Sequence, residues 1–242
     1  GVKNAVISIA SNDLDEPVFD LLLRAKAVGE DDGVPAAIED LGLNNGDGNN
    51  DDILDSRQSN VATLMDSYGN YVTHIANSGY NFRNMTALLT TDLASPPVNF
   101  VIGSGIVDFT IEGVTPGGLL EVGVVMPVTV NPDAYYIYGA TADDPTQHWF
   151  NFDYDGETGL PFPLRGDATF TTSTGTNFVA SILTLIFKDG GRGDADMTVN
   201  GVIKVTSAIS ARTSDRGASI DFLQILCLIL VLISARYFSR VA

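Results

Sequence analysis

The feature that most constrains this chain is a series of short segments with two-residue hydrophobic alternation, each bounded by turn-forming residues. In "VDFTIEG", Val107, Phe109 and Ile111 alternate with polar residues, so that the apolar side chains share one face of a strand. Further strand candidates are "LLEVGVVMPV", "AYYIYGA", "HWFNFDYD" and "NFVASILTLIF". No βαβ alternation and no long helix interrupts them. Residues 61–206 therefore predict an all-β fold, an antiparallel β-sandwich.

Residues 4–28 predict two further strands around a turn. Val6, Ile7 and Ile9 form one apolar run, and the second run alternates from Phe19 to Leu23. A two-stranded hairpin is only marginally stable alone. We therefore expect residues 1–28 to be the end of an upstream β domain. The first residue is then expected to be a cut edge within a longer protein, or the start left by processing.

Residues 29–60 differ in composition, being rich in Asp, Asn and Gly and poor in β-branched residues. A short helical patch, "PAAIEDLGL", opens with Pro35 and ends near Gly42, as helices tend to. The acidic run "NNGDGNNDDILDS" at residues 44–56 allows two interpretations. It is either a solvated linker or a cradle for a hard cation such as calcium.

The spacing within this run favours calcium. On a twelve-position calcium loop, positions 1, 3, 5 and 9 are taken by the oxygen donors Asp47, Asn49, Asp51 and Asp55. The glycine of position 6 is replaced by Asp52 and the glutamate of position 12 by Gln58, so the loop is not an EF-hand. The pattern instead resembles the thrombospondin type 3 calcium repeat.

A second copy of the template fits residues 28–39 less well. Glu30 and Asp32 take positions 3 and 5, Gly33 takes position 6 and Glu39 takes position 12. Val28 and Ala36, however, fall where positions 1 and 9 need donors. With half of its ligands, this copy either shares an ion with its neighbour or binds none.

The overall charge excludes one class of partner. Thirty Asp and Glu against thirteen Lys and Arg give a net charge of −17, whereas a nucleic-acid binder needs a basic face. A single cysteine, Cys227, precludes a disulfide within the chain, and two histidines, His74 and His148, argue against a multi-histidine metal site.

The C-terminal part predicts a linker and an anchor. Residues 207–219 are small and polar. Residues 220–235 are almost continuously apolar, and arginines follow at 236 and 240. Residues 220–242 are therefore expected to form an apolar helix that serves as a membrane anchor or sorting segment, with its positive end in the cytoplasm. The alternative is a terminal core helix, because the apolar run is short for a membrane span.

Two loops carry acidic residues that could serve other chemistry. "FDYDGETG" places Asp153, Asp155 and Glu157 beside His148 and Trp149, as a glycosidase or a glycan-binding loop would, but an ordinary turn uses the same residues. "KDGGRGDAD" contains Arg-Gly-Asp at residues 192–194, the tripeptide of adhesion proteins. It also contains three potential cation ligands, Asp189, Asp194 and Asp196. A structural turn is the simpler interpretation.

Several segments together resemble the bacterial choice-of-anchor U domain over roughly residues 30–206. They are "VPAAIEDLGLNNGDGNNDDILDS", "VDFTIEGVTPGG", "YYIYGATADDPTQHWFNFDYDGETG" and "LTLIFKDGGRGDADMTVNGVI". The resemblance implies a surface protein with a C-terminal anchoring signal. The tail is similar to a GlyGly-CTERM sorting segment, although no Gly-Gly pair precedes its apolar run. The opening hairpin is similar to the end of the immunoglobulin-like domains that often precede such domains.

The expected function is therefore that of a non-enzymatic, calcium-stiffened stalk at the bacterial cell envelope, with the membrane and a sorting protease as partners. The competing hypothesis is an adhesion module that binds a glycan or a surface protein.

Overall fold

The computed structural model describes residues 2–10, 12, 18–26, 31–97, 100, 102–130, 132–161 and 165–211. The predicted N-terminal hairpin is present. Strand β1 (Val2–Ala10) pairs antiparallel with β2 (Val18–Lys26), and Val6 lies opposite Leu22. Both of these apolar side chains are more than half exposed.

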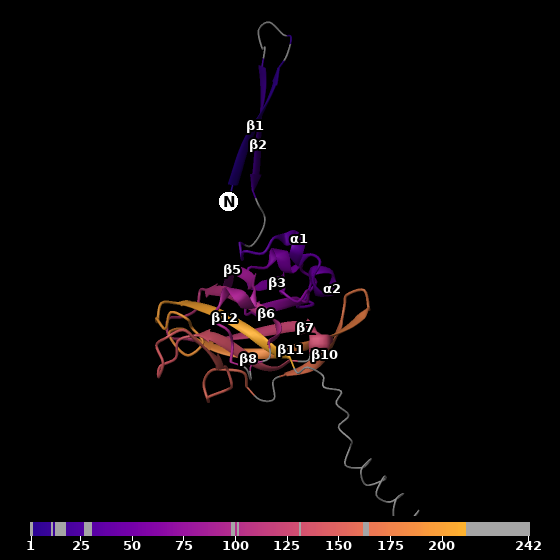
Figure 1. Ribbon diagram of the computed structural model, residues 1–242. Coiled ribbons are helices and arrows are strands. Elements are labelled where there is room, and N and C mark those ends of the chain that lie inside the picture. The colour runs from indigo at the N-terminus through magenta and orange to yellow at the C-terminus, as the bar shows by residue number, and fades with distance from the viewer. Residues whose placement is uncertain are drawn as a thin grey trace, which may run out of the picture. The chain divides into compact units, whose positions relative to one another are not determined.

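Residues 61–211 contain two antiparallel sheets of five strands, which confirms the all-β prediction (Figure 1). The first sheet has the order β10-β11-β7-β4-β3, with β3 at Val61–Met65, β4 at Tyr71–Ala76, β7 at Leu119–Pro127, β10 at Arg165–Thr171 and β11 at Asn177–Lys188. The second has the order β5-β6-β12-β8-β9, with β5 at Asn81–Leu88, β6 at Ile102–Glu112, β8 at Pro132–Gly139, β9 at His148–Asn151 and β12 at Val202–Ala211. Short 3-10 turns lie at Thr90–Asp92 (η2) and Val128–Val130 (η3).

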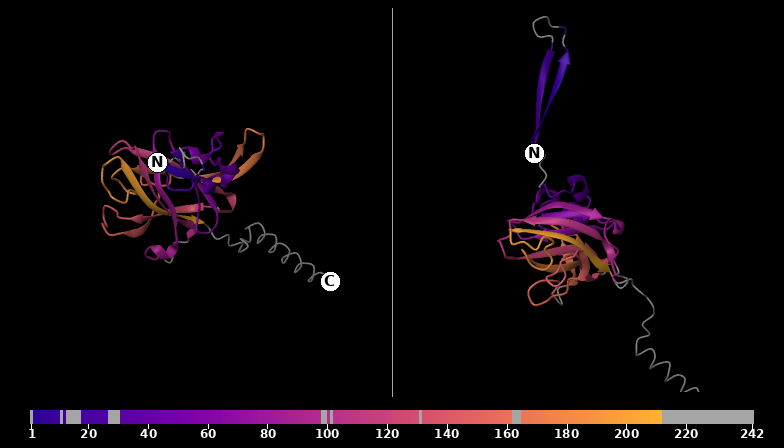
Figure 2. Two further views of the ribbon diagram at one scale, coloured as in Figure 1. Left: turned by 90° about the horizontal axis from the view of Figure 1, so that it is seen from above. Right: turned by 60° about the vertical axis from the view of Figure 1, so that its left-hand side comes forward.

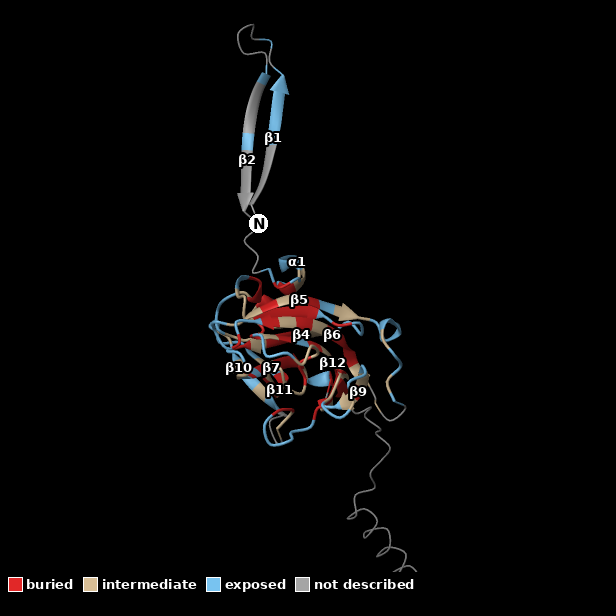
Figure 3. Ribbon diagram, turned by 90° about the vertical axis from the view of Figure 1, so that its left-hand side faces the viewer, coloured by how far each residue is buried: buried red, intermediate tan, exposed pale blue. Residues whose placement is uncertain are grey.

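The inner faces of the two sheets form one apolar core, shown by the red segments of Figure 3. Val107, Phe109 and Ile111 are buried, whereas the side chains between them face outward, as the alternation predicts. The Phe109 ring lies 5.8 Å from the ring of Phe82 in its own sheet and 6.4 Å from that of Phe187 in the other. Aromatic contacts across the interior therefore join the two layers.

The acidic segment packs against the sandwich instead of forming the linker expected from its composition. Helix α1 (Ala36–Glu39) and the 3-10 turn η1 (Asp55–Arg57) both contact β3, and α2 (Leu43–Gly46) contacts β4 (Figures 1 and 2). α1 lies within the predicted helical patch. The composition of the segment did not indicate this packing, because three of the carboxylates that made it look solvent-exposed are themselves buried. They are Asp32, Glu39 and Asp55.

The sandwich also extends beyond residue 206, where a linker was expected to begin. Strand β12 continues to Ala211 and lies between β6 and β8. Its small residues suit this central place. Ala208 packs beneath Tyr136 and Trp149, and the Ser207 hydroxyl accepts a hydrogen bond of 2.6 Å from the hydroxyl of Tyr135. Residues 212–242, including the predicted anchor, lie outside the described residues.

Candidate functional site

Asp47 folds the first half of the predicted calcium loop around its own carboxylate. Its two oxygens accept the backbone N–H groups of Asp51 and Asp52, at 3.0 and 3.1 Å. Asp52 has a φ of 68°, the left-handed conformation for which calcium loops use glycine. The sharp turn that the template demands at position 6 is therefore made, with an aspartate in place of the glycine.

Asp55, the ninth position of the template, points into the protein. Its carboxylate is fully buried and accepts both the Gly48 N–H and a 2.5 Å hydrogen bond from the Thr63 hydroxyl, which in turn lies 2.6 Å from the hydroxyl of the buried Thr73. Burial raises the pKa of Asp55 to about 6, and the charge of Asp47 adds to this effect. A Cβ at Gly48 would collide with the Thr73 hydroxyl, so only glycine permits this approach.

The calcium donors therefore already hold hydrogen bonds within the chain. Asp51 accepts hydrogen bonds from the Ile53 N–H and the Gln58 amide. The Asn49 side-chain oxygen, in contrast, is buried and has no hydrogen-bond partner within the described part of the chain. Within the described residues, no three acidic, histidine or cysteine side chains converge in a metal-binding arrangement. Calcium remains a prediction, since binding would require Asp47 and Asp51 to exchange backbone donors for an ion.

Only part of the second calcium template, at residues 28–39, lies within the described residues. Glu30 lies outside them. Asp32 is buried, with one carboxylate oxygen accepting the Val34 N–H at 2.8 Å and the other without a hydrogen-bond partner among the residues that the structure describes. Burial raises the pKa of Asp32 to about 6. The sharing of one ion between this carboxylate and the Asp47 loop also stays a prediction.

The acidic residues of "FDYDGETG" are engaged in holding a turn. Asp155 accepts the N–H groups of Glu157 and Thr158, and Glu157 pairs with Lys188 at 2.6 Å. Although desolvation opposes ionisation, the hydrogen bonds from Thr158 and Glu157 keep the pKa of Asp155 below its usual value. These contacts favour the turn interpretation over a pair of catalytic carboxylates.

Trp149, the aromatic residue near this loop, also contacts other parts of the chain. Trp149 is 7% exposed, and its indole N–H donates to the Ala94 carbonyl at 2.8 Å. His148 lies at the surface, where its Nδ1 is 2.9 Å from the Thr146 carbonyl and 3.6 Å from an Asp144 carboxylate oxygen. The buried Trp149 therefore offers little surface on which a sugar could stack.

The tripeptide 192–194 lies in a structural turn. Asp194 is fully buried and accepts the N–H groups of Gly190 and Lys204. Arg192 donates to two backbone carbonyls of the β9 region, those of Asn151 and Asp153, and its guanidinium lies 4.9 Å from the Phe152 ring centre. Since its acidic residue is buried, this tripeptide is not displayed as an adhesion loop.

Asp189 and Asp196 of the same loop also serve the chain itself. The Asp189 carboxylate accepts backbone N–H groups from Gly117 and from residues 200–202. Asp196 pairs with Lys204 at 3.0 Å. These acids are loop-organising acceptors, which is the turn interpretation of this sequence.

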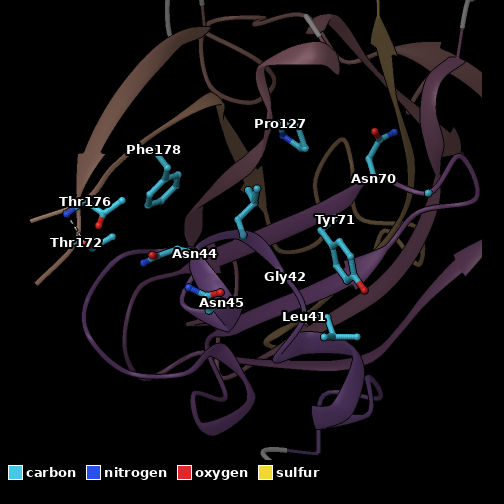
Figure 4. Close-up of a pocket in the computed structure, with 12 residues that line it drawn as sticks. Leu41, Gly42, Asn44, Asn45, Asn70, Tyr71, Pro127, Thr172, Thr176 and Phe178 are labelled. Carbon is cyan, nitrogen blue, oxygen red and sulfur yellow. Dashed lines mark hydrogen bonds between the residues drawn. The ribbon is translucent and has the colours of Figure 1, made fainter. Parts of the chain in front are cut away.

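A groove that sequence patterns did not indicate lies at one end of the first sheet. Its volume is about 520 Å³, and it runs between α2 and the β10–β11 turn (Figure 4). A second hollow of about 320 Å³ shares Asn44, Asn45, Thr172 and Thr176 with it. Asn44 and Asn45 have φ values of 52° and 59°, a left-handed pair that asparagine tolerates better than most residues.

Comparison of the chain with protein-family models, with curated proteins and with solved structures found no match. The function must therefore be inferred from the residues of this chain. Among the described residues, no helix is both long and apolar enough to span a bilayer.

Proposed function

We propose that this chain is a non-enzymatic stalk module of a bacterial cell-surface protein, which presents upstream domains away from the cell envelope. Residues 1–28 would end an upstream immunoglobulin-like domain, and the C-terminal segment would anchor or sort the protein. The resemblance to choice-of-anchor U domains supports this proposal, as does the series of strand segments followed by an apolar tail.

The observation that carries the proposal is the bonding of the acidic segment to the sandwich. Thr63 on β3 donates its backbone N–H to Glu39, at 3.1 Å, and its hydroxyl to Asp55. Asn50 reaches the Thr171 carbonyl of β10, at 3.1 Å. A segment fixed to both edge strands of one sheet behaves as part of a stiff body, which is what a stalk requires.

The path of the chain also suits a stalk. The acidic segment precedes β3, and α1 lies on one side of the sandwich, whereas β12 ends away from α1 (Figures 1 and 3). A module that is entered and left on different sides can be joined in series with its neighbours. The acids considered for hydrolysis are occupied in turns, which favours a structural role over an enzymatic one.

Calcium is the proposed stiffening ion. We expect the thermal unfolding midpoint of the full chain to rise with calcium concentration, because an ion that binds only the folded state stabilises it by about 2.7 kcal/mol at one hundred times its Kd. Asp51→Ala should remove most of this rise, since it deletes a donor. The measurement is differential scanning calorimetry with and without calcium.

Asp144→Ala is the matched control. Like Asp51, Asp144 is exposed and accepts the N–H of the residue two positions later, but it lies outside the acidic segment. It should leave the calcium effect unchanged. Extracellular calcium modules bind with Kd values up to about 1 mM. If isothermal titration of the full chain detects no binding at about 1 mM calcium, the calcium proposal is wrong, whereas the proposed stalk function is unaffected.

The anchor has a separate test. Deleting residues 217–242 from the protein, exported in a Gram-negative host, should move it from the membrane fraction to the medium, because the apolar run and its arginines are removed. Deleting residues 1–28 instead should leave it in the membrane fraction. If the C-terminal deletion stays membrane-bound, the anchoring role is wrong. Finding Ala242 intact by mass spectrometry would exclude processing by a sorting protease and leave anchoring in place.

A further inference from the structure

We infer that the groove between α2 and the β10–β11 turn is a binding site for a short neutral oligosaccharide. Its floor is the end of the first sheet, where Tyr71 of β4, Pro127 of β7 and Phe178 of β11 come from three neighbouring strands. Its wall is α2. Figure 4 shows Phe178 and Tyr71 toward opposite sides of the groove, with Asn44 and Asn45 below Phe178 in this view.

The size of the groove suits a ligand longer than one sugar. The main groove and the adjoining hollow measure about 520 and 320 Å³. Small-molecule sites typically span about 300–1,000 Å³. One face of the Phe178 ring is stacked on Phe170, with 4.8 Å between the ring centres. The Tyr71 ring and the rest of the Phe178 ring provide two separate apolar surfaces, each suited to the C–H face of a pyranose ring. An extended chain of sugars would contact both, whereas a monosaccharide would contact only one.

The polar groups of the groove are available to a ligand. The Asn45 amide and the Tyr71 hydroxyl have no hydrogen-bond partner among the described residues. An amide donates and accepts, as does a phenol, and this is the pairing that sugar hydroxyls require. Asn44, in contrast, donates to the Asp47 carbonyl at 3.0 Å and thereby holds α2 in place. One asparagine thus positions the wall, and the other is left for the ligand.

The charge of the site selects neutral sugars. Asp47 and Asp52 line the adjoining hollow, and no Lys or Arg is among the described residues that line either space. The whole chain carries a net charge of −17. Uronic acids, sialic acids and phosphorylated glycans would meet repulsion without a compensating cation. This site lies apart from the "FDYDGETG" loop, and the inference goes beyond the stalk function without depending on it.

The test is titration calorimetry of the full chain with maltohexaose, cellohexaose, chitohexaose and, as the acidic comparison, an oligouronate of equal length. We expect at least one neutral hexasaccharide to bind with a Kd of about 1 mM or tighter and the oligouronate not to bind. Tyr71→Ala should weaken the binding about tenfold, since it removes an aromatic contact of the kind that dominates interfaces. Asn45→Gly should also weaken it, and glycine tolerates the left-handed backbone at this position.

Tyr154→Ala is the matched control, because Tyr154 is 47% exposed and does not line the groove. It should leave the affinity unchanged. If Tyr71→Ala fails to fold, Tyr71→Phe combined with Asn45→Gly keeps the ring and removes both free polar groups, and it should still lose affinity. Absence of binding to every neutral probe, a preference for the oligouronate, or binding unaffected by the groove variants would overturn the inference. None of these outcomes bears on the anchor.

Discussion

Phe109→Asp should prevent the sandwich from folding. The Phe109 ring is 1% exposed and touches aromatic rings of both sheets. Losing a buried phenylalanine ring costs about 3–5 kcal/mol, and burying an unpaired carboxylate adds several more. Small domains have only about 5–15 kcal/mol of stability in total. We expect the far-ultraviolet circular dichroism of the variant to lack the strand signal and its urea transition to disappear.

Thr110→Asp is the control one residue along the same strand. Thr110 faces outward, and its cross-strand neighbours are Lys204 on β12 and Arg83 on β5. A carboxylate there would lie between two cations at the surface, so its effect should stay within about 1 kcal/mol. Equal loss of structure in both variants would mean that β6 tolerates no charge on either face. The assignment of Phe109 to the core would then be wrong.

Asp189→Ala should lower the free energy of unfolding by about 3 kcal/mol or more, because each buried N–H left without an acceptor costs about 1–3 kcal/mol. The Asp189 carboxylate is 1% exposed and joins the β6–β7 turn to the start of β12. It accepts N–H groups from Gly117 at 2.8 Å and Gly201 at 3.0 Å, with longer contacts to Asn200 and Val202. With alanine at this position, these backbone N–H groups would either stay buried without an acceptor or have to turn toward water. Urea denaturation measures the difference.

Asp196→Ala is the comparison within the same loop. Asp196 forms a partly exposed pair with Lys204, and such pairs contribute about 0–1 kcal/mol. Equal destabilisation by the two substitutions would show that the loop as a whole, and not the buried carboxylate, sets the stability. Although burial opposes ionisation, the backbone N–H donors keep the pKa of Asp189 below its usual value. The ionised carboxylate is therefore the form that the folded protein holds at this position.

The sequence predicted the strands whose side chains alternate in character. β6, β7, β8 and β11 were expected close to where they lie, because apolar residues on one face of a strand leave a two-residue pattern. The last half of β12 lacked this signal. Ala208 is small, and the aromatic residues Tyr136 and Trp149 pack with it. Small residues resemble a linker when their neighbours in space are unknown.

The acidic residues were harder to interpret than the strands. A short carboxylate that accepts backbone N–H groups and one that binds calcium occur in similar Asp- and Gly-rich segments. Asp66, for example, accepts the N–H groups of Tyr68, Asn70 and Gly105 and is buried. The groove could not be predicted from the sequence, because Tyr71 and Phe178 are separated by more than one hundred residues and come to line one groove only through the order of the strands in the sheet.

The central place of β12 governs when this protein can fold. A chain leaves the ribosome with its N-terminal residues first. The β5–β6 and β8–β9 pairs can form early, but each keeps an open edge until the ten residues of β12 insert between them. The second sheet must therefore stay incomplete until residue 211 is available. If the protein is exported, as we propose, late closure of this sheet would keep the chain unfolded enough for transport until β12 has crossed the membrane.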